Sequence, residues 1–470
     1  MGSEMCIRDR FLAAGAGAPI SSIHTRAAML ARASVLVQGK SGIRPQLVER
    51  LLRFLNEGFT PIVRELGSLG ASGDLVPLSC IARAITGSGK SRIDWRGETL
   101  GSDEALKHLG LEPVKLRPKE GLALVNGTSF SSAIAANSTF EAKRLFAISM
   151  AAQSMMMRAL LVQTSPFEDF VHQAKPHPGQ VWTARLVRQL LTEGAEPIEA
   201  TPEVVQDRYS LRCMPQYTGA IAEGLARVQR AVETEMNAVS DNPLIDVETG
   251  DFYQSGNFLG QYISIAMDDL RRFIGLLAKH LDVQIATLVA PEFNGGLSPS
   301  LLGNPASSFN MGLKGLQICG NSIMPMLTHA ANPIAEHFPT HAEQFNQNIN
   351  GLSWGSANLA WKSVELFQQY TAVSLIFAVQ ALDLRAKQVF GHFDGRRLLG
   401  TKVRRVYEAV CEAVEADPGE AKPFLHDDAD RWLERDVERL AAAVASHDSS
   451  LAFGVQPILG SFNEHFEVSQ

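Results

Sequence analysis

The chain has 470 residues and a formal net charge of −7 at pH 7, with 45% hydrophobic and 20% charged residues. This length can bury a large core, and the acidic balance argues against a nucleic-acid-binding protein, which needs a basic face. No apolar run reaches the roughly 18 residues of a membrane span, so we expect no membrane partner. Five scattered cysteines without Cys-x-x-Cys spacing favour a reducing, cytoplasmic location over a disulfide framework or a zinc site.

The first ten residues, 1–10, contain no apolar region of the kind that a signal peptide requires. We interpret them as a foreign or artefactual start, joined to a chain that is truncated at its N-terminus.

The most informative segment is the loop Gly70-Ala71-Ser72-Gly73-Asp74. In a tight bend, the amide nitrogen of Gly73 can attack the carbonyl carbon of Ala71 and close a five-membered ring. Gly73 has no Cβ, so its nitrogen can approach closely in an unusual backbone conformation. Loss of two waters, one of them from the Ser72 side chain, leaves a 4-methylidene-imidazol-5-one (MIO). This group offers a carbon acceptor for an amine, which no ordinary side chain does.

Two other interpretations of serine and glycine motifs fail on spacing. A nucleophile elbow needs Gly-x-Ser-x-Gly, and Asp74 stands at its last position. The run 86–91 resembles a phosphate-binding P-loop, but Ala84 stands where that motif needs its first glycine. The preceding residues, 81–85, also predict a helix rather than a strand.

Helical periodicity dominates the rest of the chain, apart from one small hairpin expected over 92–99. Apolar residues on nearly every face of 352–384 predict a helix buried in a bundle. We expect Met150 and Met155–Met157 to fill the core. Two further stripes with steps of three and four residues predict helices: Ile221, Leu225, Val228, Val232, Met236 and Val239, and Leu433, Val437, Leu440 and Val444.

Several strings in a fixed order resemble the aromatic amino acid ammonia-lyases, which include the phenylalanine and histidine ammonia-lyases, and most closely the bacterial, cyanobacterial-type phenylalanine enzymes. They are the loop 67–78 together with 11–17, 126–129, 176–180, 206–213, 241–244, 256–261, 312–315 and 341–348. The resemblance implies a mainly α fold, an aspartase/fumarase-like bundle of long helices with a smaller mixed N-terminal domain that carries the prosthetic group. We accordingly expect an N-terminal domain over 11–125, a central bundle over 126–390 and a C-terminal helical region over 391–470.

The resemblance also implies a prosthetic group and an assembly. MIO would form autocatalytically from Ala71, Ser72 and Gly73, with no external cofactor and no metal. The family forms homotetramers in which several chains build each active site, and its substrates are small aromatic amino acids. A zinc-binding helix through His337 and His341 is disfavoured because Pro339 lies between them.

Site residues follow from the same resemblance. The catalytic set comprises Ala71, Ser72, Gly73, Asn126, Tyr209, Arg212, Phe258 and Glu343. The substrate-binding set comprises Phe11, Leu12, Gln206, Asn242, Lys314, Asn346 and Gln347.

Each of the main residues has an expected role. Asn126 would donate to the imidazolone oxygen, or else simply cap a loop as a buried amide. Arg212 would hold the substrate carboxylate as a bidentate fork, and Tyr209 would share its helical face. Phe258 would pack beside the prosthetic group. Glu343 would lie near the substrate amine, with Asn346 and Gln347 on the same face.

The expected reaction is elimination of ammonia from L-phenylalanine to give trans-cinnamate, because Phe11-Leu12 matches the phenylalanine-preferring pattern. A 2,3-aminomutase or a tyrosine ammonia-lyase of the same family remains open, as does an inactive truncated scaffold. In the family a loop before the Phe-Leu position carries a tyrosine that removes the β-proton. The first tyrosine here is Tyr209, so we expect impaired activity.

Overall fold

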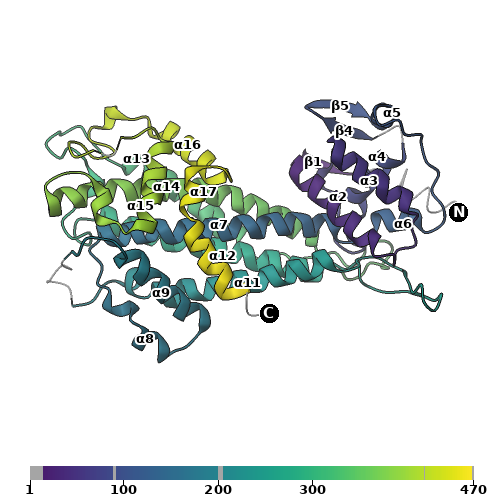
Figure 1. Ribbon diagram of the computed structural model, residues 1–470, viewed down its shortest axis with the longest axis horizontal. Helices are drawn as coiled ribbons and strands as arrows, with labels where there is room; N and C mark the ends of the chain where they lie inside the picture. The colour runs from purple at the N-terminus through teal and green to yellow at the C-terminus, as the bar shows by residue number, and fades with distance from the viewer. Residues whose placement is uncertain (1–13, 88–90, 199–204, 418, 468–470) are drawn as a thin grey trace. The chain divides into compact units, whose positions relative to one another are not determined.

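A computed structural model describes residues 14–87, 91–198, 205–417 and 419–467. The fold is mainly α-helical (Figure 1), which confirms the expected class. Its strands form three small antiparallel sheets. They are β1 (Ala16–Pro19) with β3 (Arg64–Leu66), β2 (Thr60–Pro61) with β4 (Arg92–Trp95) and β5 (Glu98–Gly101), and β6 (Leu244–Ile245) with β7 (Phe252–Tyr253). The β4–β5 pair confirms the hairpin expected over 92–99.

The described chain divides into two compact units. The first unit contains residues 14–139, 227–270 and 332–362, and the second contains the remaining described residues. The domain boundaries expected from the sequence stay a prediction.

Five helices of the first unit precede or follow the loop 70–74 along the chain. They are α2 (Ser22–Val37), α3 (Pro45–Glu57), α4 (Leu75–Thr86), α5 (Ser102–His108) and α6 (Glu120–Val125). Helix α3 begins with a proline, whose fixed φ suits a first turn, and ends at Gly58 in the left-handed conformation. Helix α4 likewise ends at Gly87 with φ 84°. It occupies the segment before the rejected P-loop string and so confirms a helix there.

Four long helices have residues in both units. They are α7 (Ser129–Ala159), α11 (Met214–Asn237), α12 (Gln261–Val289) and α14 (Ser353–Phe390). Helix α14 confirms the helix expected over 352–384, and its residues Val373–Val379 are fully buried. Helix α11 confirms most of the predicted stripe but ends at Asn237, so Val239 lies beyond it.

The second unit adds shorter helices around its own core. They are α8 (Asp169–Gln173), α9 (Pro178–Thr192), α10 (Tyr209–Arg212), α13 (Lys314–Ala330), α15 (Thr401–Ala413), α16 (Leu433–Ala445), α17 (Ser450–Gly454) and α18 (Gln456–Glu467). Helix α16 confirms the stripe that begins at Leu433. Met150 and Met155–Met157 are fully buried, as expected of core residues. None of the helices in the described part of the chain is both long and apolar enough to cross a lipid bilayer.

Candidate active site

The loop before α4 is tightly bent. Gly70 and Gly73 have φ values of 68° and 67°, a region that favours glycine. The Ser68 hydroxyl closes the bend: it accepts from the Gly70 N–H at 3.2 Å and donates to the Gly73 carbonyl oxygen at 3.1 Å. The backbone around Ala71-Ser72-Gly73 is therefore held in a tight bend.

Gly73 lies directly against a second motif, Asn126-Gly127-Thr128-Ser129. Gly73 and Gly127 form a parallel bridge, and the Asp74 N–H donates to the Gly127 carbonyl oxygen at 2.7 Å. A Cβ on Gly73 would lie 2.1 Å from that oxygen. Only glycine fits this position, because a larger residue would push the two segments apart.

Asp74 is a buried residue that the sequence reasoning did not assign to the site. Its Oδ2 accepts from the backbone N–H groups of Phe130 at 3.0 Å and Ser131 at 2.7 Å, in the first turn of α7. Its Oδ1 is buried without a hydrogen-bond partner, and burial raises the pKa of the carboxyl to about 7. Asp74 thereby ties the loop to the start of α7. The sequence signal that could have identified Asp74 as a site residue is its position directly after Ala71-Ser72-Gly73.

A cavity of about 230 Å³ opens beside Ser72 within the first unit. Its lining includes the loop residues Ala71, Ser72 and Gly73 and, from a distant part of the chain, Glu343 and Gln347. The Gln347 Nε2 donates to the Ser72 Oγ at 2.9 Å. The structure thus brings five of the expected site residues together.

The segment that carries Glu343 is not helical. Glu343, Gln344 and Phe345 have φ values of 46°, 54° and 68°, and Ala342 bridges Gln347. The expectation that Glu343, Asn346 and Gln347 share a helical face is therefore wrong, because this left-handed turn replaces a helix. The turn itself carries Glu343 and Gln347 to the cavity, and the Asn346 Nδ2 lies 3.5 Å from the Glu343 carboxylate.

Asn126 is 2% exposed, and its side-chain amide is held by acceptors. Its Nδ2 donates to Asp241 Oδ1 at 3.3 Å and to the Asn242 carbonyl oxygen at 3.2 Å. Both partners accept, so the amide orientation follows from the contacts. The Asn242 Oδ1 in turn accepts from the Ser255 N–H at 2.5 Å.

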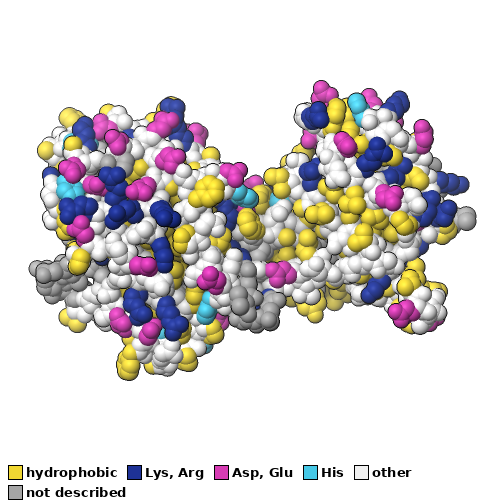
Figure 2. Space-filling model, viewed as in Figure 1, with side chains coloured by type: hydrophobic (Ala, Val, Ile, Leu, Met, Phe, Trp, Pro, Cys, Tyr) yellow, Lys and Arg dark blue, Asp and Glu magenta, His cyan; other side chains and the backbone are white. Residues whose placement is uncertain are grey.

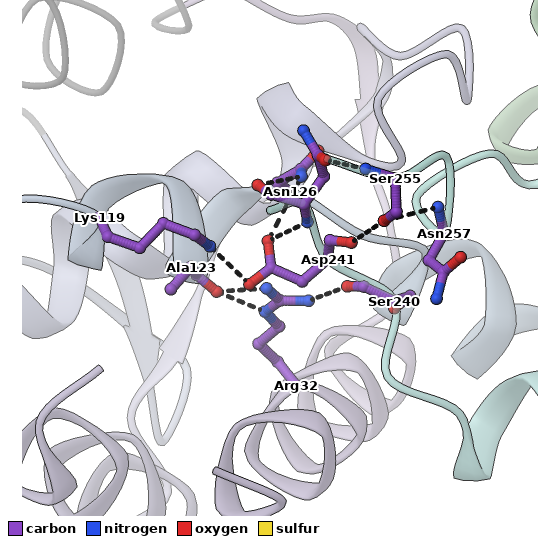
Figure 3. Close-up of polar contacts among 9 residues, drawn as sticks. Arg32, Lys119, Ala123, Asn126, Ser240, Asp241, Ser255 and Asn257 are labelled. Carbon is purple, nitrogen blue, oxygen red and sulfur yellow. Dashed lines mark hydrogen bonds and ion pairs between the residues drawn. The ribbon is translucent and has the colours of Figure 1, made fainter. Parts of the chain in front are cut away.

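Asn126 is linked through Asp241 to a cluster of charged side chains (Figure 3). The Lys119 Nζ is 2.8 Å from Asp241 Oδ2, and Arg32 donates to the carbonyl oxygens of Ala123 and Ser240. Burial lowers the pKa of Arg32, and the charges of Asp241 and Asp74 partly offset this. The sequence reasoning also missed Arg32, Lys119 and Asp241, although Asp241 directly precedes the expected Asn242.

Four of the other expected residues belong to the second compact unit: Gln206, Tyr209, Arg212 and Lys314. The Arg212 guanidinium lies 4.7 Å from the centre of the Tyr209 ring, which confirms that the two share one side of α10. Tyr209 is 73% exposed, and Gln206 and Lys314 are also exposed.

The remaining expectations have simpler outcomes. Phe258 is half-buried in the first unit, two residues before Gly260, whose N–H donates to the Gly70 carbonyl oxygen at 3.4 Å. Phe11 and Leu12 lie outside the described residues. Within the described ranges, no group of three or more His, Cys, Asp and Glu side chains could hold a metal ion.

Comparison with known proteins assigns the family. The model of a family described as aromatic amino acid lyase matches residues 9–412. A phenylalanine ammonia-lyase from Nostoc punctiforme is 49% identical over 444 residues, which cover 93% of this chain and 78% of the relative. The chain belongs to the aromatic amino acid lyase family. It is a carbon–nitrogen lyase, and the resemblance inferred from its motifs is confirmed.

Solved structures confirm the lyase fold. Histidine ammonia-lyase from Trypanosoma cruzi matches with a TM-score of 0.85 at 26% identity, over 98% of this chain and 84% of that one. Phenylalanine aminomutase from Pantoea agglomerans matches with a TM-score of 0.84 at 28% identity, over 95% of this chain and 85% of that one. The helical bundle is therefore shared by lyases and aminomutases.

The residues of this lyase fit the MIO group that its family uses. Gly70 and Gly73 supply the left-handed backbone, and Ser72 lines a cavity of about 230 Å³. Gln347 donates a hydrogen bond to the oxygen that Ser72 would have to lose.

Proposed function

We propose that this lyase eliminates ammonia from L-phenylalanine to give trans-cinnamate, with MIO formed from Ala71, Ser72 and Gly73. The observation that carries the proposal is the loop itself, bent at two glycines and seated with Ser72 at a cavity. The 49% identity to a phenylalanine ammonia-lyase supports the choice of substrate.

The proposed maturation needs only the chain's own atoms. The Gly73 nitrogen bonds to the Ala71 carbonyl carbon, whose oxygen leaves as water. Ser72 loses its hydroxyl and its Cα hydrogen as a second water, so no oxidant is consumed. The hydrogen bond from Gln347 to the Ser72 Oγ would stabilise the departing oxygen. The mature chain would then be lighter by two waters, about 36 Da.

Other residues would bind the substrate. Once formed, the methylidene group would supply a carbon electrophile for the substrate amine. The Arg212 guanidinium suits a carboxylate because its fork donates two parallel hydrogen bonds. The Glu343 carboxylate, which lines the cavity beside Ser72, would accept a hydrogen bond from the substrate amine and orient it toward the methylidene carbon.

The assembly is a separate part of the proposal. We propose a homotetramer, as the resemblance implies, because helices α12 and α13 expose large apolar side chains.

Intact mass and cinnamate absorbance test the function. We expect the mass deficit of two waters and cinnamate production in the wild type, and neither in Ser72→Ala. Gln347→Glu tests the hydrogen bond to Ser72 separately, because a carboxylate cannot donate to the Ser72 oxygen at neutral pH. A wild-type protein of full mass, or one that converts tyrosine or histidine faster than phenylalanine, would overturn the proposal.

An aminomutase is the second candidate, and the Pantoea agglomerans phenylalanine aminomutase supports it. Such an enzyme returns ammonia to the β-carbon. Chromatography of the products separates the two, since an aminomutase accumulates β-phenylalanine faster than cinnamate.

A polypeptide of these 470 residues has no tyrosine before Tyr209. The family tyrosine that removes the β-proton is thus not among residues 1–208. Loss of a general base typically costs about 10²–10⁴ in rate. We therefore expect slow turnover from this polypeptide, and rescue when a family-like N-terminal segment with the tyrosine is added. Equal rates for the two polypeptides would show that another group removes the proton.

A further inference from the structure

Hydrogen bonds connect three segments in series: 240–242, 126–128 and the loop 70–74. The segment 240–242 holds 126–128: Asp241 and the Asn242 carbonyl accept from Asn126, and the Ser240 Oγ accepts from the Thr128 N–H at 3.2 Å. Gly127 in turn bridges Gly73 and accepts from the Asp74 N–H. A Cβ on Gly127 would lie 2.2 Å from the Ser240 carbonyl oxygen. The position of Gly73 therefore depends on the segment that contains Asp241.

Asp241 is the hub of this arrangement (Figure 3). Its Oδ1 accepts from the Asn126 Nδ2 at 3.3 Å and from the Asn242 N–H at 2.7 Å, and its Oδ2 pairs with Lys119 at 2.8 Å. The Asp241 side chain is fully buried. The Asp241 carboxylate thus orients the side-chain amide of Asn126, and the Lys119 ammonium balances the charge of Asp241.

We propose that Asp241 is a positioning residue that acts through Asn126 to hold Gly127, and hence Gly73, in place for ring closure. This inference rests on the proposed function, because it concerns how the MIO group forms. Lys119 pairs with the other carboxylate oxygen, Oδ2, whereas Asn126 donates to Oδ1, so the role of Lys119 is indirect.

The chemistry of the carboxylate explains why aspartate is needed. Both of its oxygens accept, so it can face two donor groups and the Lys119 ammonium at once. An asparagine in its place would have to turn a donor either toward Lys119 or toward Asn126. Next to a lysine it would turn its oxygen to the ammonium, and its NH₂ would then face the Asn126 NH₂. Asn126 would keep the Asn242 carbonyl oxygen but would meet a donor in place of its Asp241 acceptor, so its side chain would turn away.

Three variants separate positioning from stability: Asp241→Asn, Lys119→Met and the double variant. Lys119→Met keeps the acceptor for Asn126. In the double variant, the introduced amide has no lysine to face, so its oxygen can return to Asn126. We expect the fraction of chains with the two-water mass deficit to fall at least tenfold in folded Asp241→Asn. We expect it to stay near wild type in Lys119→Met and to be largely restored in the double variant.

Amide hydrogen exchange supplies a readout that does not depend on the ring. We expect Asp241→Asn to accelerate exchange in the peptide spanning 68–76, and Lys119→Met and the double variant to leave it near wild type. Folded Asp241→Asn with a full mass deficit and unchanged exchange would overturn the inference. If Asp241→Asn does not fold, a folded double variant without the deficit overturns it instead. A wild type without the two-water mass deficit would refute the proposed function. Amide hydrogen exchange in 68–76 would still test whether Asp241 positions the loop.

Discussion

Two buried carboxylates near the loop experience opposite surroundings. Asp241 lies beside Lys119 and close to Arg32, so cations balance its charge. Asp74 accepts only from backbone N–H groups and the Ser131 hydroxyl, and its Oδ1 has no partner. Burial disfavours the charged form of Asp74, and the hydrogen bonds from Phe130 and Ser131 offset this only in part, so the pKa of Asp74 rises to about 7.

The raised pKa of Asp74 predicts a pH dependence of stability. In the unfolded chain the group loses its proton near its ordinary pKa of 3.8, whereas the folded protein keeps it until about 7. The folded state binds more protons across this window, so stability falls as pH rises. The slope is up to about 1.4 kcal/mol per pH unit for one group.

Asp74→Asn should remove this contribution. The amide keeps an oxygen for the Phe130 and Ser131 N–H groups and does not ionise. We expect the loss of thermal stability between pH 4 and pH 7 to be smaller in the variant than in the wild type. Asp383, also raised to about 7 by burial, is present in both proteins and cancels in the comparison. Exposed Asp448→Asn is the matched control, and parallel curves for Asp74→Asn and wild type would refute the assignment.

At the scale of elements, the pattern of apolar residues predicted helices more reliably than the spacing of polar residues did. Helix α14 is apolar around its circumference over Val373–Val379, and its prediction is confirmed. Glu343 and Gln347 have helical spacing, yet their segment forms a left-handed turn. Spacing of four residues between polar groups carries no packing energy, whereas a buried apolar stripe does.

Phe367 tests the contribution of α14 to stability. The side chain is fully buried, and truncation of a buried phenylalanine typically costs about 3–5 kcal/mol because it removes apolar contact and leaves a cavity. We expect Phe367→Ala to lower the urea midpoint of unfolding clearly. Gln369→Ala, an exposed position on the same helix, should leave the midpoint within error. Similar midpoints for the two variants would contradict a packed core around α14.

For the whole molecule, the surface gives two signals. On the face drawn in Figure 2, basic and acidic side chains are interspersed. Helix α13 nevertheless exposes Ile318 (66%) and Met326 (56%), and α12 exposes Tyr262 and Ile265. Large exposed apolar side chains on long helices indicate surfaces that another chain covers.

We expect the lyase to be a homotetramer by light scattering at micromolar concentration. Ile318→Glu would place a charge on the exposed apolar face of α13, so we expect a smaller assembly. Phe170→Glu on the short helix α8 changes an even more exposed side chain (88%) and should leave the tetramer intact. A monomeric wild type would reject this assembly, and a tetrameric Ile318→Glu would show that the exposed face of α13 is not part of the interface.

The sequence by itself determined the family, the mainly helical class and the reactive loop. Ala71-Ser72-Gly73 is a local chemical pattern, and the hairpin at β4–β5 and helix α16 follow from local patterns as well. These features are local because turn chemistry and apolar periodicity act over a few residues.

Only the tertiary structure decided what surrounds the loop. Asn126 meets Asp241 across 115 positions of sequence, and Gln347 meets Ser72 across 275. Asp74 stands at the start of α4 but binds the first turn of α7. Such pairings depend on which distant segments pack together, because a buried donor or acceptor must find a partner there and no local pattern names it.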